Sequence, residues 1–260
     1  MLVLLSPAKT FNTKLAVPYD FPVRAPEFYS TKTQELIKEL KKLDLKALES
    51  LLDVSEKIAQ TNLERYTSWT KELNAENAKP AAFSFWGDVN KHFDAFSLSQ
   101  EQLEYADNNV LYLSGLYGPV RPLDAIKEYR LEMGKALATS ATCKNLYQFW
   151  QKTLVDYLNQ RIKDEKHSFI LNLASKEYAG AVDFKQLSVP SIEVQFKDQK
   201  NGVYKVISVI AKRSRGEFAR WVVENKITEV EELKGFNVGG YYFKPEESTD
   251  SLFTFYRDEK

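Results

Sequence analysis

Four short, mainly apolar runs constrain this chain more than any other feature. They occupy residues 2–5, 110–113, 169–173 and 204–211, and longer polar or mixed segments separate them. A strand that is apolar on both faces belongs inside a sheet that helices cover from both sides. The sequence therefore predicts a mixed α/β fold, with a central mixed sheet flanked by helices.

Each apolar run ends in a loop or helix start that carries positive charge. The cations at these four places are Lys9, Arg121, Lys176 and the triplet Lys212, Arg213 and Arg215. In covered sheets, ligands lie outside the carboxyl ends of the strands, where helix N-termini direct free amides at anions. If at least three of the strands are parallel neighbours, their loops form one basic cleft. The alternative is that these side chains are simply solvated, as polar loop residues usually are.

The stretch 111–133 predicts a strand, a loop and then a helix. Gly115 and Gly118 allow the backbone to adopt a positive φ or to approach another segment closely. Pro122 suits the first turn of a helix because it has no amide hydrogen to lose. We expect that helix to carry Arg130.

Residues 30–70 form a helical element with leucines at three- and four-residue spacing. Asp44 is an expected N-cap, and Asp53 or Ser55 is expected to start a third helix. The segment 51–59 is similar to the helix-hairpin-helix motif of DNA-binding proteins and includes Lys57, although Asp53 and Ser55 replace both glycines of the hairpin. The alternative is three packed helices joined by capped turns.

Other patterns predict the remaining elements. Helices are expected at 99–108 and 147–162, and Asn201-Gly202 predicts a hairpin between a strand at 192–196 and the run at 204–211. Further short strands are expected at 82–86, 241–243 and 252–256.

Composition bounds the class of protein. Lys and Arg (36) balance Asp and Glu (36), so a basic site must come from local segregation of charge. The single Cys143 favours a reducing compartment, and the N-terminal apolar run is too short for a signal peptide. We expect one domain spanning residues 1–260 in a cytoplasmic monomer with no membrane segment. His92 and His167 lie far apart in sequence, so no metal site is expected. The sequence contains neither a P-loop nor a GxGxxG run, and no cofactor is expected.

Acidic and aromatic residues near the basic loops leave an enzyme possible. Asp88, Asp124 and Glu177 are weak candidates for acid or base chemistry, and an ion-pair role is the alternative for each. Tyr117, Tyr129 and Tyr178 are candidates for stacking on nucleic-acid bases, with packing in the core as the alternative.

Several phrases of the chain resemble the YaaA family of bacterial peroxide-stress proteins. They are Ser6–Thr10, Gly87–Val89, Leu113–Gly118 with Arg121–Asp124 and Tyr129–Gly134, Asn172–Tyr178, and Lys212–Gly216. The chain departs from the usual pattern at Asn90, His92 and Pro119. The resemblance implies a mixed α/β fold with a helix-hairpin-helix element and a positively charged cleft. It also implies DNA binding and protection from hydrogen peroxide by keeping free intracellular iron low.

Carried over by position, the resemblance implies a cleft lined by the cations at the ends of the four apolar runs, together with Arg130. Its cleft residues are Lys9, Arg121, Arg130, Lys176, Lys212, Arg213 and Arg215. The main hypothesis is therefore a protein that binds duplex or distorted DNA. The alternatives are an enzyme acting on a nucleotide, nucleobase or other phosphorylated small molecule in the same cleft, and a scaffold for a partner protein.

Overall fold

The structure, a computed structural model, describes residues 1–259 and has the expected mixed α/β architecture. A sheet with the strand order β4-β3-β1-β6-β7-β10-β9 runs through the molecule, and β8 pairs with β7. Its strands are β1 (Leu2–Leu5), β3 (Val110–Ser114), β4 (Gly118–Val120), β6 (Ile170–Asn172), β7 (Ser191–Lys200), β8 (Val203–Lys205), β9 (Tyr242–Phe243) and β10 (Leu252–Arg257). A small second sheet pairs β2 (Lys79–Pro80) with β5 (Ala125–Ile126).

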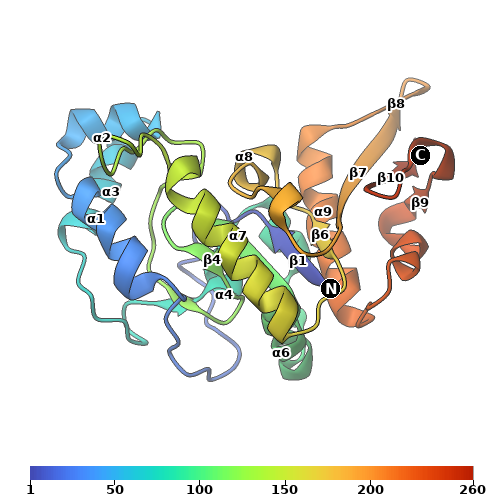
Figure 1. The fold of residues 1–260 in the computed structure, drawn as a ribbon, viewed down its shortest axis with the longest axis horizontal. Helices are drawn as coiled ribbons and strands as arrows, with labels where there is room; N and C mark the ends of the chain where they lie inside the picture. Colours follow the sequence, from blue (N-terminus) through green and yellow to red (C-terminus); the bar gives the residue numbers. More distant parts are fainter. Residues whose placement is uncertain (260) are drawn as a thin grey trace.

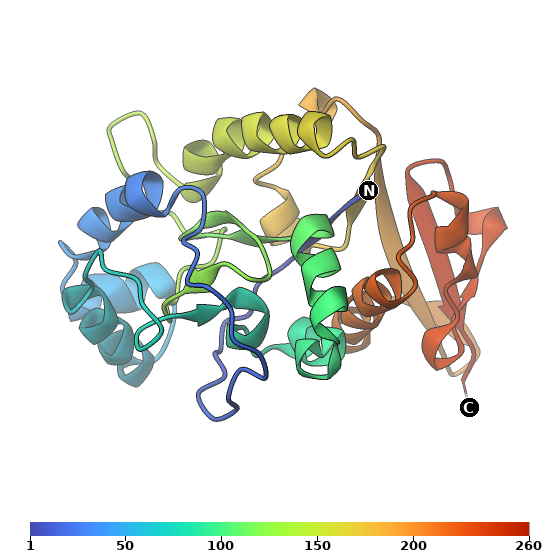
Figure 2. The same ribbon diagram turned by 90° about the horizontal axis from the view of Figure 1, so that it is seen from below.

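Helices cover both faces of the sheet. They are α1 (Gln34–Leu40), α2 (Leu45–Leu52), α3 (Glu56–Thr67), α4 (Ala81–Ser84), α5 (Asp88–Phe93), α6 (Gln100–Asn109), α7 (Leu146–Asp164), α8 (Lys176–Ala179) and α9 (Ser208–Glu224). Figures 1 and 2 show α7 on one face and α6 and α9 on the other, with α1–α3 at one end of the molecule and the C-terminal strands at the opposite end. No helix among residues 1–259 has the length and apolarity needed to cross a membrane.

The first apolar run forms the buried strand that the sequence predicts. β1 runs parallel to β3 on one side and to β6 on the other. Its four residues are fully buried, because the sheet separates two layers of helices at this point. β6 in turn runs parallel to β7, so β1, β3, β6 and β7 all point the same way.

The two glycines after β3 serve the two purposes expected of them. Gly118 has a φ of 72°, which suits the tight turn into β4. At Gly115, a Cβ atom would lie 2.3 Å from the carbonyl oxygen of Leu131. The helix predicted from Pro122 is therefore wrong, because the chain continues through β5 and an extended segment that packs its backbone directly against Gly115.

Two strand predictions also need correction. Residues 82–86 are not a strand, because Ala81–Ser84 forms the helical turn α4; alanines favour a helix, and the fixed φ of Pro80 suits its start. The hairpin at Asn201-Gly202 is confirmed, but β8 ends at Lys205 and α9 begins at Ser208. Buried positions recur along α9 with helical spacing, at Ala211, Ser214, Phe218 and Val222.

The N-terminal helical element contains α1, α2 and α3. Asp44 caps α2 by accepting a hydrogen bond from the Ala47 amide at 2.8 Å, as expected. Of the two candidates for the start of α3, Ser55 is the residue that precedes the helix. Asp53 ends α2 with a φ of 53°, a left-handed conformation that glycine adopts more easily. Lys57 lies exposed in the first turn of α3.

The other predicted elements are present. Ser99 caps α6 in a capping box with Gln102, and α7 buries one apolar side against the core. In the C-terminal part, β9 pairs antiparallel and β7 pairs parallel with β10. Apolar residues from the N-terminal run, the central stretch and the tail pack into one cluster.

Candidate anion-binding pocket at the strand ends

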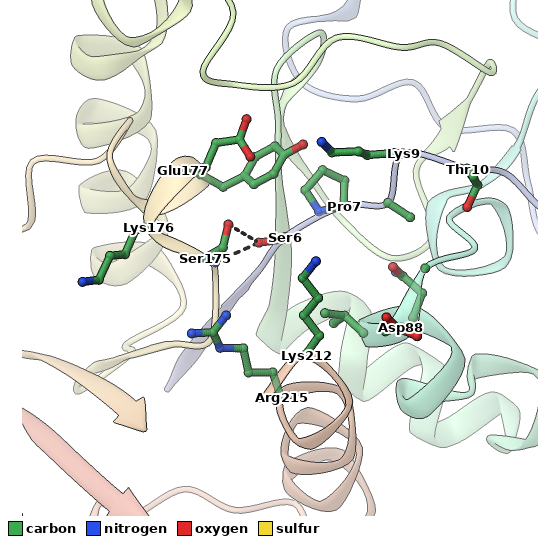
Figure 3. Close-up of a pocket in the computed structure, with 15 residues that line it drawn as sticks. Ser6, Pro7, Lys9, Thr10, Asp88, Ser175, Lys176, Glu177, Lys212 and Arg215 are labelled. Carbon is green, nitrogen blue, oxygen red and sulfur yellow. Dashed lines mark hydrogen bonds between the residues drawn. The ribbon is translucent and has the colours of Figure 1, made fainter. Parts of the chain in front are cut away.

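A pocket of about 480 Å³ opens where β1 and β6 end. Its walls come from the loop after β1, the start of α5, the start of α8 and the N-terminal half of α9 (Figure 3). The lining residues are Ser6, Pro7, Ala8, Lys9, Thr10, Gly87, Asp88, Val89, Asn90, Ser175, Lys176, Glu177, Tyr178, Lys212 and Arg215. Most of these belong to the phrases that the sequence singles out.

Direct contacts hold the two strand-end loops together. The Ser175 amide donates a hydrogen bond to the Ser6 hydroxyl at 2.9 Å, and the two hydroxyl oxygens lie 3.3 Å apart. Because β1 and β6 are parallel neighbours, their carboxyl ends meet at the same edge of the sheet. At Gly87, a Cβ atom would lie 3.0 Å from the Ala8 Cβ, so the start of α5 packs tightly on the loop after β1.

Positive side chains outnumber carboxylates in the lining. Lys9, Lys176, Lys212 and Arg215 are opposed by Asp88 and Glu177 alone. Figure 3 shows Lys212 directed toward the middle of the pocket, whereas the Lys176 side chain points away from the Ser6–Ser175 pair. Burial lowers the pKa of Arg215, but its ordinary value is so high that the guanidinium stays charged. The pocket lining therefore carries four cationic and two acidic side chains, although the whole chain has no net formal charge.

A buried carboxylate outside the pocket lining forms a salt bridge with one of these cations. Glu132 is 2% exposed, and its Oε1 lies 3.2 Å from the Lys9 ammonium and 2.7 Å from the Arg130 Nε. Arg130 does not line the pocket, so its link to the site passes through Glu132. Glu132 thus has the ion-pair role that its sequence position beside the basic loops suggests, and it holds Arg130 and Lys9 together.

Unpaired polar atoms occur in the wall formed by α5 and α9. Asn90 is 4% exposed, and neither its amide oxygen nor its amide nitrogen has a hydrogen-bond partner among the described residues. The buried Nε of Arg215 also has none. Burial raises the pKa of Tyr112, and the nearby Asn90 amide partly offsets that rise, although the two groups do not meet hydrogen-bond geometry.

The structure places Arg121 away from this pocket. It follows β4, which runs antiparallel to β3, so it lies at the opposite edge of the sheet. There its guanidinium pairs with Asp107 at 2.9 Å and donates to Asn108. The expectation that four strand ends would bring Arg121 and Lys9 together is wrong because β4 reverses the chain.

Asp124 lies at the same distant edge. Its carboxylate accepts a hydrogen bond from Arg24 at 2.6 Å and another from the Arg121 amide at 2.7 Å. Burial raises the pKa of Asp124 to about 6, and Arg24 limits the rise. These contacts make Asp124 an ion-pair residue at a distance from the pocket.

The other candidates divide between the pocket and its surroundings. Asp88 and Glu177 line the pocket, and Glu177 also accepts a long hydrogen bond from the Gly134 amide. Arg213 and Lys57 are exposed but are not pocket residues. Of the three tyrosines proposed to stack on bases, only Tyr178 lines the pocket; Tyr117 and Tyr129 are buried in the core.

Sequence reasoning missed two parts of this site. Ser6 and Ser175 each follow a fully buried strand by one or more residues, and that shared position is the signal that was available. Asn90 gave no such signal, because its burial depends on how α5 packs against α9. A Cβ atom at Gly216 of α9 would lie 2.2 Å from the Val89 carbonyl oxygen of α5, which shows how closely the two helices approach.

The arrangement suits an anion. Ammonium and guanidinium groups, with hydroxyls and loop amides nearby, bind phosphate oxygens. Within the described part of the chain, no group of three or more His, Cys, Asp or Glu side chains is placed to hold a metal ion.

The fold and the pocket together define a mixed α/β protein with a pocket at its strand ends that four cationic side chains line. Comparison with known proteins assigns the family. Residues 1–247 match the family described as "Peroxide stress protein YaaA". A UPF0246 protein of Aliivibrio fischeri strain MJ11 is 44% identical over 260 residues, covering 100% of this chain and 99% of the relative. A UPF0246 protein of Shewanella baltica strain OS223 is 44% identical and is covered completely. The chain belongs to the YaaA family of peroxide stress proteins.

Proposed function

We propose that this protein binds DNA through the strand-end pocket and, by doing so, limits DNA damage during hydrogen peroxide stress in the cytoplasm. The observation that carries the proposal is that Lys9, Lys176, Lys212 and Arg215 all line one pocket, although the Lys176 side chain points away from its middle. They come from three segments that are distant in sequence, so the fold itself segregates charge in a chain with equal numbers of acidic and basic residues.

Phosphates of a nucleic acid are the natural ligands for such a cluster. The DNA backbone supplies most of the affinity of a protein that neutralises it, and each contact depends on charge and not on base sequence. Arg213, exposed beside Lys212 on α9, and Lys57, exposed at the start of α3, are proposed as additional phosphate contacts outside the pocket. Arg130 contributes by holding Glu132, which positions Lys9.

The family description concerns peroxide stress and names no ligand. We propose that the protein keeps free intracellular iron low indirectly, through its action on DNA. We also propose that the protein acts as a monomer.

Fluorescence anisotropy with a labelled short duplex tests the proposal. Lys212→Gln and Lys9→Gln are each expected to weaken binding by about fivefold, or about 1 kcal/mol, for any duplex sequence. Lys152→Gln is the matched control, because Lys152 is 87% exposed on α7 and does not line the pocket. Pocket variants that bind every duplex as tightly as the control would refute DNA binding at this site.

An enzyme that acts on a nucleotide or another phosphorylated small molecule remains the second candidate. Asp88 and Glu177 favour it, because both carboxylates line the same basic pocket and can serve as an acid or a base. Incubation of the protein with mononucleotides, followed by chromatography, tests this candidate. Product that disappears in both Asp88→Asn and Glu177→Gln would support catalysis, and unchanged substrates would exclude it for those compounds.

A further inference from the structure

Arg215 is a partly buried cation that has no salt-bridge partner among residues 1–259. On α9, the salt bridges of those residues belong to Arg220, which contacts Asp94 at 3.4 Å and Glu224 at 2.8 Å. The Nε of Arg215 is buried without a hydrogen-bond partner, and its two terminal nitrogens also lack a partner but are open to solvent. Burial lowers the pKa of Arg215, and the exposed Glu193 offsets only part of that effect. An unpaired guanidinium that lines a pocket points to an anionic ligand.

Lys212 and Ser175 add two more free donors to the same pocket. Lys212 lies one turn before Arg215 on α9 and, like it, forms no salt bridge with a described residue. Figure 3 shows both side chains extending from α9 toward the Ser6–Ser175 pair. The Ser175 hydroxyl accepts a hydrogen bond from the Ser6 hydroxyl, so its own hydrogen remains to be donated. The pocket therefore offers an ammonium, a guanidinium and a hydroxyl to one ligand.

The cations that remain for a ligand match a doubly charged anion. Lys9 is already paired with Glu132, and the Lys176 side chain points away from the middle of the pocket. Lys212 and Arg215 are therefore the two cations without a partner. A phosphate that ends a chain carries a charge of about −1.5 to −2 at pH 7, whereas a phosphodiester inside a DNA strand carries a single negative charge.

The shape of the site also favours a group at the end of a chain. Four segments form the walls of the pocket, so it is a recess and not an open surface. A terminal phosphate projects from the last nucleotide and can enter such a recess more fully than a phosphate that is bonded on both sides. The two carboxylates of the lining leave room for it, because Figure 3 shows Asp88 and Glu177 on other sides of the pocket from the Arg215 guanidinium.

We infer that the pocket binds a terminal phosphate, a phosphomonoester, on Lys212, Arg215 and the Ser175 hydroxyl. This group has two sources, the end of a DNA strand and a phosphorylated small molecule. In naming a DNA strand as one source, the inference rests on the proposed DNA-binding function.

Fluorescence anisotropy of the full chain with one internally labelled duplex tests the site. The duplex is prepared with phosphates on both 5′ ends, with phosphates on both 3′ ends, or with hydroxyls on all ends. One phosphorylated form is expected to bind at least about tenfold more tightly than the hydroxyl form, because it adds hydrogen bonds between charged groups. The same duplex with methyl esters on its terminal phosphates loses the second charge and is expected to bind like the hydroxyl form.

Three variants connect the preference for a phosphorylated end to the pocket. Arg215→Gln is expected to abolish it, and Lys152→Gln, outside the pocket, is expected to keep it. The melting temperature of Arg215→Gln is expected not to fall, because the change removes no salt bridge of the described chain. A lower melting temperature with the preference retained would give Arg215 a structural role and overturn the inference. If Arg215→Gln does not fold, the exposed Lys212→Gln decides, and an unchanged preference there overturns the inference.

Isothermal titration with ribose 5-phosphate distinguishes the two sources and the two proposals, with ribose as the control. Tighter binding of a phosphorylated duplex identifies the end of a DNA strand as a ligand. Binding of ribose 5-phosphate, but not of ribose or of any duplex, supports the terminal-phosphate site and overturns the proposed DNA function. Equal binding of all duplexes, with no binding of ribose 5-phosphate, overturns the terminal-phosphate site and leaves DNA binding intact. No binding of any probe overturns both.

Discussion

Glu132 offers the sharpest test of how the pocket is built. Its carboxylate is 2% exposed, and its Oε1 contacts both the Lys9 ammonium and the Arg130 guanidinium. Glu132→Gln keeps the shape of the side chain and removes its charge. Arg130 is then left largely buried without a carboxylate partner. Lys9 is 55% exposed, so the loss of its ion pair costs little stability.

The expected loss of stability follows from the contact with Arg130. A hydrogen bond to a charged group contributes about 1.5–3 kcal/mol, and the Lys9 contact adds little because solvent screens it. For a chain of this size, that loss lowers the melting temperature by roughly 3–12 °C. Thermal unfolding followed by circular dichroism measures it.

Three further variants complete the test. Glu246→Gln is the matched control, because Glu246 is 70% exposed beside Lys244 and its loss is expected to leave the melting temperature unchanged. Arg130→Gln and the double variant form a cycle whose coupling free energy is expected to exceed about 0.5 kcal/mol. The reasoning is refuted if Glu132→Gln is no more destabilising than Glu246→Gln.

Three other variants test separate parts of the account. Gly115→Ala is expected to lose roughly 1–3 kcal/mol of stability, because its Cβ meets a backbone carbonyl, whereas Gly235→Ala has open space and should be neutral; urea titration compares them. Burial lowers the pKa of His167, so the unfolded chain takes up a proton first and stability is expected to fall below about pH 6.5. His167→Gln should flatten that pH profile, and an unchanged profile would contradict the assignment. Arg121→Gln should lower the melting temperature but leave DNA affinity unchanged, because Arg121 pairs with Asp107 far from the pocket.

The sequence predicts the layers of this fold better than its central connection. Mainly apolar runs identify β1, β3 and β6 because a strand buried on both faces has few polar positions. The helix predicted after Gly118 is wrong although the apolar spacing of that segment fits a helix. The segment is extended because its backbone at Leu131 packs against Gly115, which is not a sequence neighbour. Local pattern cannot reveal that contact.

The sequence likewise predicts some residues of the candidate site and not others. Lys9 and Lys176 were expected at one edge of the sheet because parallel neighbours end together, and both line the pocket. Lys212 and Arg215 also line it, but from a helix and not from a strand end. Arg121 was misplaced because nothing in its own loop shows that β4 turns back on β3.

The salt dependence of DNA binding tests the central claim most directly. Each phosphate contact that a protein makes with duplex DNA adds about 0.9 to the slope of log Kobs against log salt concentration. We predict that Lys212→Gln reduces that slope by about one, whereas Lys152→Gln leaves it unchanged. Identical slopes for the wild-type protein and Lys212→Gln would contradict the claim that the strand-end pocket binds the DNA backbone.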